Sequence, residues 1–244
     1  MSKIKLYNDD ALKILKTIPS ESIDLILSDV PYLVTSRGGS VCSMGGYWVK
    51  DLTRKGKIFD NNNIKVKDYI YDMYRILKDK SICLLMINNV NLIEMLNEGE
   101  KAGFNFVKCL IWEKGNSKIC GRYGMSCFEY IVLFRKGGDR PFNDCGTPDI
   151  LHIPINKLKD ENGNNLHDTE KPVKLMEILI KNCSNEGDTV LDCFMGIGSS
   201  GVASKKNNRN FIGCEIDEKY FKVAEERING TFGKTKIEDS IFGL

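Results

Sequence analysis

Residues 25–32 place groups that can do chemistry at the end of an apolar run. Leu-Ile-Leu-Ser is followed by Asp29, Val30, Pro31 and Tyr32, which indicates a buried parallel strand whose carboxyl end opens into a site. Pro31 restricts Val30 to extended backbone, so the Asp29 carboxylate and the Val30 carbonyl are expected to lie side by side near the Tyr32 ring. Two acceptors beside an aromatic ring can hold a planar group that bears an amino group. An ordinary strand exit is the alternative interpretation.

A second group of residues has the spacing of a nucleotide-binding loop. Gly196, Gly198 and Gly201 spell G-x-G-x-x-G between an apolar strand and a helix, and Glu215 ends the next strand about 20 residues later. The glycines let a ligand approach the backbone closely, and a carboxylate at that distance can bind ribose hydroxyls. The sequence therefore predicts a site for a nucleotide-like cofactor.

The composition places the chain among globular α/β proteins. It has 244 residues, 42% of them apolar, and a net charge of only +2. Nine cysteines without a C-x-x-C pair indicate reduced thiols, and two histidines argue against a zinc site, so we expect no metal. We expect no leader, and the sequence contains no uninterrupted apolar run of about 18 residues. We therefore expect a cytoplasmic protein with no membrane association.

Alternating apolar stretches of strand and helix length define the elements that position these groups. The helix expected at residues 92–102 should stop at Gly103. The strands 104–112 and 127–134 follow each other without a helix between them, which predicts that they pair antiparallel. The other expected strands are 4–7, 23–28, 81–87, 189–193 and 211–214, with a short extended stretch at 150–153, and the other expected helices are 12–18, 68–78, 172–181, 201–206 and 218–228.

The order of these elements is unusual for a doubly wound sheet. Only one helix and a short tail follow Glu215, so the missing strands have to come from the N-terminal part of the chain. This requirement predicts that strand 23–28 lies beside strand 189–193, and that Asp29 and Gly196 face one crevice. We therefore expect one domain, residues 1–244.

Five spaced segments resemble the β group of amino-directed DNA methyltransferases, in which the catalytic motif precedes the cofactor motif. Residues 29–32 are similar to D-P-P-Y, with Val30 in place of the first proline. The other similar segments are 8–12 (N-G-D-A-L), 167–172 (H-x-T-x-K-P), 190–198 (V-L-D-P-F-x-G-S-G, with Cys193 and Ile197 as departures) and 211–215 (F-I-G-I-E). The resemblance covers nearly the whole chain.

The resemblance implies a fold and a cofactor. The fold would be a doubly wound, mostly parallel, seven-stranded Rossmann-like methyltransferase sheet with one antiparallel strand, circularly permuted, with small recognition insertions. The cofactor would be S-adenosylmethionine, with Asp192 and Phe194 at its methionine end, Glu215 at the ribose and Asp10 at the adenine amino group. The full set of cofactor-binding residues implied is Asp10, Ala11, Asp29, His167, Thr169, Lys171, Asp192, Phe194, Gly196, Gly198, Ser199, Glu215 and Ile216.

The reaction implied is methyl transfer to the N6 amino group of an adenine flipped out of double-stranded DNA, with Asp29, Val30, Pro31 and Tyr32 as the catalytic residues. Three alternatives stay open. Methylation of the cytosine N4 amino group is one, although the family then more often has serine in place of Asp29. A nicotinamide-dependent dehydrogenase would share the glycine pattern, and a catalytically silent DNA-binding protein would fit the Val30 substitution.

Three basic or polar segments are candidates for DNA recognition, namely 34–57, 113–126 and 137–166. Within or beside them, Arg37, Lys55, Lys118 and Arg122 are expected to contact DNA, mostly its phosphates. The resemblance leaves open a homodimer and a cognate restriction endonuclease as partners.

Overall fold

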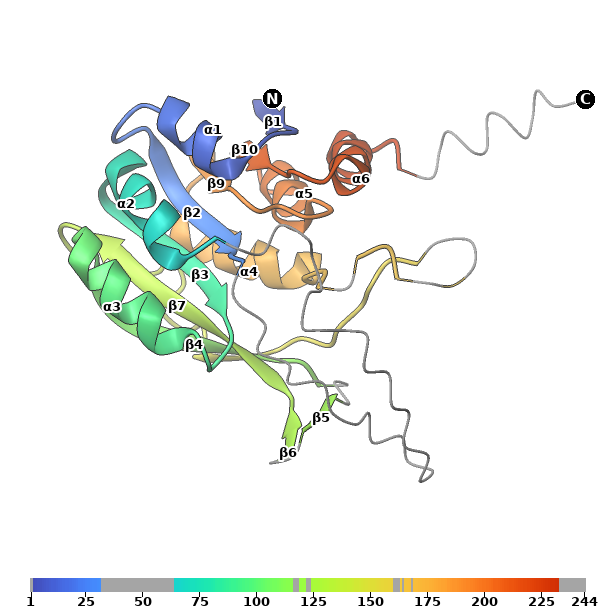
Figure 1. Ribbon diagram of the computed structural model, residues 1–244, viewed down its shortest axis with the longest axis horizontal. Helices are drawn as coiled ribbons and strands as arrows, with labels where there is room; N and C mark the ends of the chain where they lie inside the picture. Colours follow the sequence, from blue (N-terminus) through green and yellow to red (C-terminus); the bar gives the residue numbers. More distant parts are fainter. Residues whose placement is uncertain are drawn as a thin grey trace, which may run out of the picture.

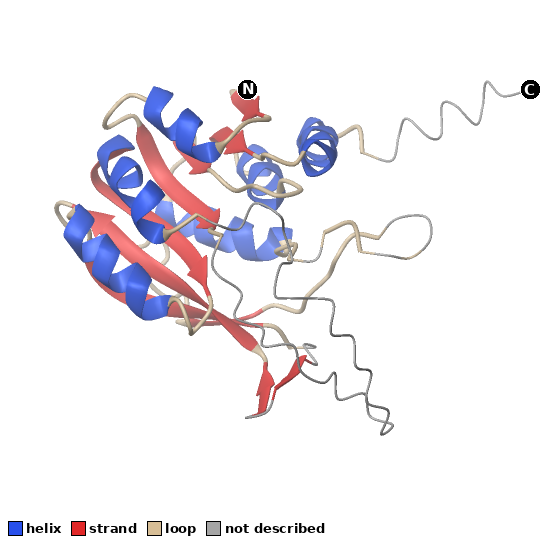
Figure 2. Ribbon diagram, viewed as in Figure 1, coloured by secondary structure: helices blue, strands red, loops and turns tan. Residues whose placement is uncertain are grey.

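The computed structural model describes residues 2–31, 64–115, 119–121, 124–159, 163, 165–167 and 169–232. Within these residues, eight strands form one sheet in the order β1-β10-β9-β2-β3-β7-β4-β8 (Figures 1 and 2). The strands of the sheet are β1 (Ile4–Tyr7), β2 (Ile23–Asp29), β3 (Leu77–Ile87), β4 (Asn105–Glu113), β7 (Phe128–Lys136), β8 (Ile150–His152), β9 (Thr189–Asp192) and β10 (Asn210–Cys214).

Six helices in the described part of the chain cover the two faces of this sheet (Figure 1). The helices α1 (Ala11–Thr17), α2 (Val66–Ile76) and α3 (Leu92–Ala102) contribute to one apolar cluster, and α4 (Val173–Cys183), α5 (Ser199–Lys206) and α6 (Glu218–Asn229) contribute to the other. Alternate residues of the central strands enter one cluster or the other, because successive side chains of a strand point to opposite faces. The sheet is therefore buried between two helical layers, as a mostly parallel sheet requires.

Local chemistry explains several of the element ends. Asp10 caps α1 by accepting a hydrogen bond from the Leu12 amide at 2.9 Å. Helix α3 ends where predicted, because Gly103 adopts a left-handed φ of 105°. Helix α2 instead stops at Ile76, two residues earlier than expected, because Leu77 already pairs with Ile23 of β2.

The permuted topology predicted from the sequence is confirmed. Strand β1 pairs in parallel with β10, and β2 pairs in parallel with β9, with Leu25 opposite Val190. Strand β7 runs antiparallel to β3 and to β4, as expected for the two strands without an intervening helix. N-terminal strands thus complete a sheet that the C-terminal strands begin.

The strand count differs by one from the expected seven. The residues 150–153 were expected only as a short extended stretch outside the seven strands, but β8 extends the sheet, with Leu151 opposite Trp112 of β4. Three residues of moderate apolar character do not predict sheet membership alone, because their pairing depends on the free edge of β4. The connection 113–126 also contains a short hairpin of β5 (Ile119–Gly121) and β6 (Gly124–Ser126).

Candidate active site

The carboxyl ends of β2 and β9 bring the two sequence motifs together. The two strands are parallel neighbours, so Asp29 and Asp192 end at the same edge of the sheet. A buried hydrogen bond joins the two strands at this edge, because Ser28 Oγ donates to Asp192 Oδ1 at 2.6 Å across 164 positions of sequence. The two motifs therefore meet at one edge of the sheet.

Asp192 is a buried and well-bonded carboxylate. Besides Ser28, it accepts hydrogen bonds from Ser200 Oγ at 2.5 Å and from the Phe194 amide at 3.1 Å. Burial raises the pKa of Asp192, while the hydrogen bonds from the two serines and the amide oppose the rise. A carboxylate has about four acceptor positions, so this network leaves room for one more donor.

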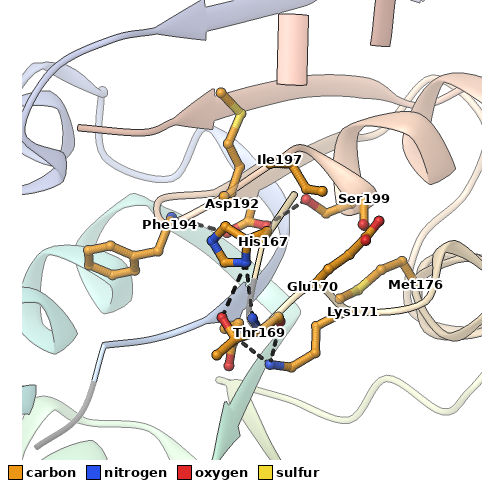
Figure 3. Close-up of a pocket in the computed structure, with 13 residues that line it drawn as sticks. His167, Thr169, Glu170, Lys171, Met176, Asp192, Phe194, Ile197 and Ser199 are labelled. Carbon is orange, nitrogen blue, oxygen red and sulfur yellow. Dashed lines mark hydrogen bonds and ion pairs between the residues drawn. The ribbon is translucent and has the colours of Figure 1, made fainter. Parts of the chain in front are cut away.

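A pocket with an empty volume of about 320 Å³ opens beside these strand ends (Figure 3). Eight of the predicted site residues line it, namely Asp29, His167, Thr169, Lys171, Asp192, Phe194, Gly196 and Ser199. Five further lining residues were not predicted, namely Glu170, Met176, Met195, Ile197 and Ser200. All five lie inside, or within four residues of, the segments 167–172 and 190–198. Their closeness in sequence to these motifs is the signal from which they could have been predicted.

Asp29 has one bonded and one open oxygen. Its Oδ2 accepts a hydrogen bond from Lys171 Nζ at 2.5 Å, while Oδ1 is buried and has no partner among the residues that the structure describes. Burial raises the Asp29 pKa to about 6; the Lys171 charge opposes the rise, and the nearby Glu129 and Asp192 charges add to it. Asp29 therefore offers a free acceptor at neutral pH, where it is mostly ionised.

The glycine loop is held by Glu215. Gly196 has a φ of +52°, and its amide donates to Glu215 Oε2 at 3.0 Å. A Cβ at position 196 would lie 3.2 Å from His167 Nε2, so another residue there would strain the positive φ and push the His167 ring away by a few tenths of an ångström. Glu215 Oε1 accepts from the Asp217 amide, and burial raises the Glu215 pKa against these two hydrogen bonds.

Besides Glu215, which contacts the glycine loop but does not line the pocket, four predicted cofactor residues lie outside the pocket lining. Asp10 caps α1, Ala11 packs in the core beneath it, and Ile216 is 49% exposed. Asn8 Nδ2 donates to the carbonyls of Glu215 and Ile216, which places the Asp10 turn beside the end of β10. The fourth residue, Gly198, has a φ of +79° and lies against Ala224 of α6.

Several predicted residues lie outside the described part of the chain. They are Tyr32 and the four expected DNA contacts Arg37, Lys55, Lys118 and Arg122. Segment 34–57 lies wholly outside, whereas 113–126 and 137–166 are described in part and contain β5, β6 and β8. Val30 is buried in the core and Pro31 is half-buried, so the turn after β2 is anchored up to residue 31.

Two charged residues near Asp29 were missed. Glu129 stands inside the apolar strand β7, and its carboxylate contacts Lys171 Nζ at 3.4 Å and Lys114 Nζ at 2.6 Å. Burial is the largest single influence and would raise the Glu129 pKa, but the two ammonium groups together lower it overall. A carboxylate in an otherwise apolar strand was the available sequence signal.

The described residues contain neither a metal-binding cluster nor a membrane-spanning helix. No group of three or more histidine, cysteine, aspartate or glutamate side chains in them could hold a metal ion. No helix in the same part of the chain is long and apolar enough to cross a membrane.

Known proteins resemble this chain along most of its length. A family described as DNA methylase matches residues 23–226. Type II methyltransferase M2.LlaDCHI of Lactococcus lactis subsp. cremoris is 28% identical over 246 residues, which cover 93% of this chain and 91% of that protein. Type II methyltransferase M.HinfI of Haemophilus influenzae is 27% identical over 243 residues, with coverage of 91% and 67%.

Solved structures share the fold. The cytosine-N4-specific PvuII DNA methyltransferase superposes with a TM-score of 0.72 at 16% identity, over 98% of this chain and 91% of that one. M1.HpyAVI in complex with S-adenosylmethionine has a TM-score of 0.65 at 23% identity, over 92% and 99%. Since the family match spans most of the sequence and the fold agrees, this chain belongs to the DNA methylase family, the S-adenosylmethionine-dependent methyltransferases that act on amino groups of DNA bases.

Proposed function

We propose that this protein transfers a methyl group from S-adenosylmethionine to the N6 amino group of adenine in double-stranded DNA. The observation that carries the proposal is the open oxygen of Asp29, a buried acceptor at the rim of the cofactor pocket. The Asp-Val-Pro-Tyr sequence at the end of β2 supports adenine, because relatives that methylate cytosine N4 more often have serine at the position of Asp29.

The pocket fits S-adenosylmethionine by its chemistry. Asp192 keeps one acceptor position for an ammonium group, and Ser199 Oγ is buried with no partner in the described part of the chain. Glu215, with each oxygen bonded once, retains acceptor positions for ribose hydroxyls. When bound, the cofactor supplies an electrophilic methyl group on a sulfonium. Phe194, Met195 and Ile197 supply apolar walls that exclude water.

The protein's own residues activate the amino group. The lone pair of that nitrogen is delocalised into the base, so the nitrogen is a poor nucleophile until acceptors hold its hydrogens. Asp29 Oδ1 and the Val30 carbonyl are the two acceptors in this proposal, and they also stabilise the positive charge that develops during transfer. The target atom is inaccessible in a duplex, so the base is flipped out, at a cost of a few kcal/mol. Tyr32 is the proposed stacking partner.

An Asp29→Ala variant tests this role. We expect it to bind S-adenosylmethionine within about threefold of the wild type and to lose methylation of duplex DNA by about 10²- to 10³-fold, because one acceptor at the developing charge is gone. Transfer of labelled methyl groups to DNA measures the rate, and calorimetry measures cofactor binding. Methylation at the wild-type rate by the alanine variant would refute the mechanism.

Cytosine N4 is the second candidate, because the PvuII enzyme, whose fold matches well, is cytosine-N4-specific. The chemistry at Asp29 would be the same, since both targets are exocyclic amino groups. Product DNA digested to nucleosides identifies the methylated base, and we expect N6-methyladenosine in its deoxy form. Detection of N4-methylcytosine alone would replace the adenine proposal. A homodimer and a cognate restriction endonuclease stay predictions from the resemblance.

A further inference from the structure

Asp29 lies at the end of a row of four charged side chains. Lys171 Nζ lies 2.5 Å from Asp29 Oδ2 and 3.4 Å from Glu129 Oε2, and Lys114 Nζ lies 2.6 Å from Glu129 Oε1. Ammonium groups and carboxylates alternate along the row, so the ionised row carries no net charge. Lys171 is therefore shared between the proposed catalytic carboxylate and a second carboxylate on β7.

Four separate parts of the fold build this row. Asp29 ends β2, Lys114 directly follows β4, Glu129 lies in β7, and Lys171 precedes α4. The two lysines also lie near the buried Trp112 ring, with Nζ 5.3 Å and 6.0 Å from its centroid. Because no single element contains the row, its geometry depends on the packing of the whole sheet edge.

Because the site is buried, water cannot easily take the place of the Glu129 carboxylate as the partner of the two ammonium groups. The Lys171 and Lys114 side chains are 5% and 9% exposed, and the Glu129 side chain is 16% exposed. Ammonium groups removed from water to this extent need carboxylate partners. Without the Glu129 carboxylate, the attraction that draws Lys171 toward β7 disappears. The Lys171 ammonium, which is already 2.5 Å from Asp29 Oδ2, can then turn toward Oδ1 as well, where it competes with an incoming amino group.

We propose that Glu129, held by Lys114, is a positioning residue for methyl transfer: it draws the Lys171 ammonium toward β7 and so keeps Asp29 Oδ1 open to the amino group of the target base. The inference rests on the proposed function, in which Asp29 accepts that amino group. Glu129 itself need not touch the base or the cofactor.

The electrostatics around Asp29 give the proposal a measurable sign. Besides burial, the influences on the Asp29 pKa are Lys171, which lowers it, and Glu129 and Asp192, which raise it. Removing the Glu129 charge therefore lowers the Asp29 pKa. Removing the Lys114 charge leaves Glu129 with a stronger hold on Lys171, which raises the Asp29 pKa.

The test compares Glu129→Gln with the wild type in rate against pH, from pH 5 to 8, and in cofactor binding. We expect kcat to fall about tenfold because Asp29 is less accessible, and the acid limb of kcat/KM to move down by about half a pH unit. S-adenosylmethionine binding is expected to stay unchanged. Glu129→Asp, which keeps a carboxylate, is expected to recover part of kcat and to restore the acid limb. A purely structural role would reduce activity without moving that limb.

Glu98→Gln is the matched control, because Glu98 also pairs with a lysine, Lys101, but lies on α3 away from the pocket. We expect it to behave as the wild type. If Glu129→Gln fails to fold, Lys114→Gln provides the test instead. We expect the acid limb of its kcat/KM profile to shift to higher pH. Wild-type kinetics in Glu129→Gln, or an unshifted limb in a folded Lys114→Gln, would overturn the inference alone. Activity that survives Asp29→Ala would instead overturn the proposed function.

Discussion

The two oxygens of Asp29 have different surroundings, and this asymmetry is central to the site at the scale of single residues. Oδ2 is occupied by the Lys171 ammonium, whereas Oδ1 has no partner in the described residues. A lysine partner keeps a half-buried carboxylate ionised without occupying both of its oxygens. The arrangement thus prepares one acceptor before the substrate arrives, which is the preorganisation that electrostatic catalysis requires.

Activity is expected to depend on pH through Asp29. Its pKa is raised to about 6, so below this value the carboxyl is increasingly protonated and loses its acceptor role. We expect kcat/KM to fall roughly tenfold per pH unit below about 6 and to level off above it, because kcat/KM reports groups of the free enzyme. Initial rates of methyl transfer between pH 5 and 8 measure this profile. A flat profile over that range would contradict the assignment.

At the scale of elements, the Arg227 side chain of helix α6 connects two segments that line the pocket. Arg227 Nη1 donates to the Ile197 carbonyl at 2.6 Å, and Nη2 pairs with Glu170 at 3.0 Å. Glu170 Oε2 also accepts from the Leu158 amide. The Arg227 and Glu170 side chains are only 8% and 3% exposed, so this ion pair is buried and joins the glycine loop to the segment before α4.

An Arg227→Met variant is expected to unfold more easily. It leaves the Glu170 carboxylate buried without its positive partner, which costs about 3–5 kcal/mol in comparable cases. The midpoint of urea unfolding measures the loss. Lys222→Met, which removes an exposed pair with Glu218 on the same helix, is the control, and its unfolding midpoint is expected to match that of the wild type, because water and salt screen an exposed ion pair. Equal midpoints for both variants would show that the buried pair contributes little.

At the scale of the whole molecule, the pocket joins the two ends of the chain. Asp29 comes from the N-terminal part, and Asp192, Gly196 and Ser199 come from the C-terminal part. A ligand that contacts both parts binds only the folded protein, since the unfolded chain does not bring them together. Cofactor binding is therefore linked to the stability of the entire sheet.

S-adenosylmethionine is expected to stabilise the protein against heat. At about 100 times its Kd, a ligand specific to the folded state adds about 2.7 kcal/mol, which corresponds to a rise in Tm of about 5–10 °C for a chain of this size. Thermal melts with and without the cofactor measure the shift. A nicotinamide dinucleotide is the control ligand and is expected to leave Tm unchanged. A shift with the dinucleotide but not with S-adenosylmethionine would favour the dehydrogenase alternative.

The sequence by itself determined most of the elements and the two motifs, because both depend on neighbours in the chain. Gly103 ends α3 through its own backbone freedom, and the glycines after β9 with Glu215 predict a nucleotide-like cofactor without coordinates. The permuted sheet also follows from counting strands on either side of Glu215. These features are local in sequence or simple consequences of element order.

Only the tertiary structure decided which groups face Asp29 and which do not reach the pocket. Lys171 was predicted on the cofactor side, but it also bridges Asp29 and Glu129, two residues 100 positions apart on different strands. Asp10 caps α1 and does not line the pocket, so its contact with the cofactor stays a prediction. The physical reason is common to both cases. Ion pairing and burial depend on distances in space, and strands far apart in sequence set those distances when the sheet assembles.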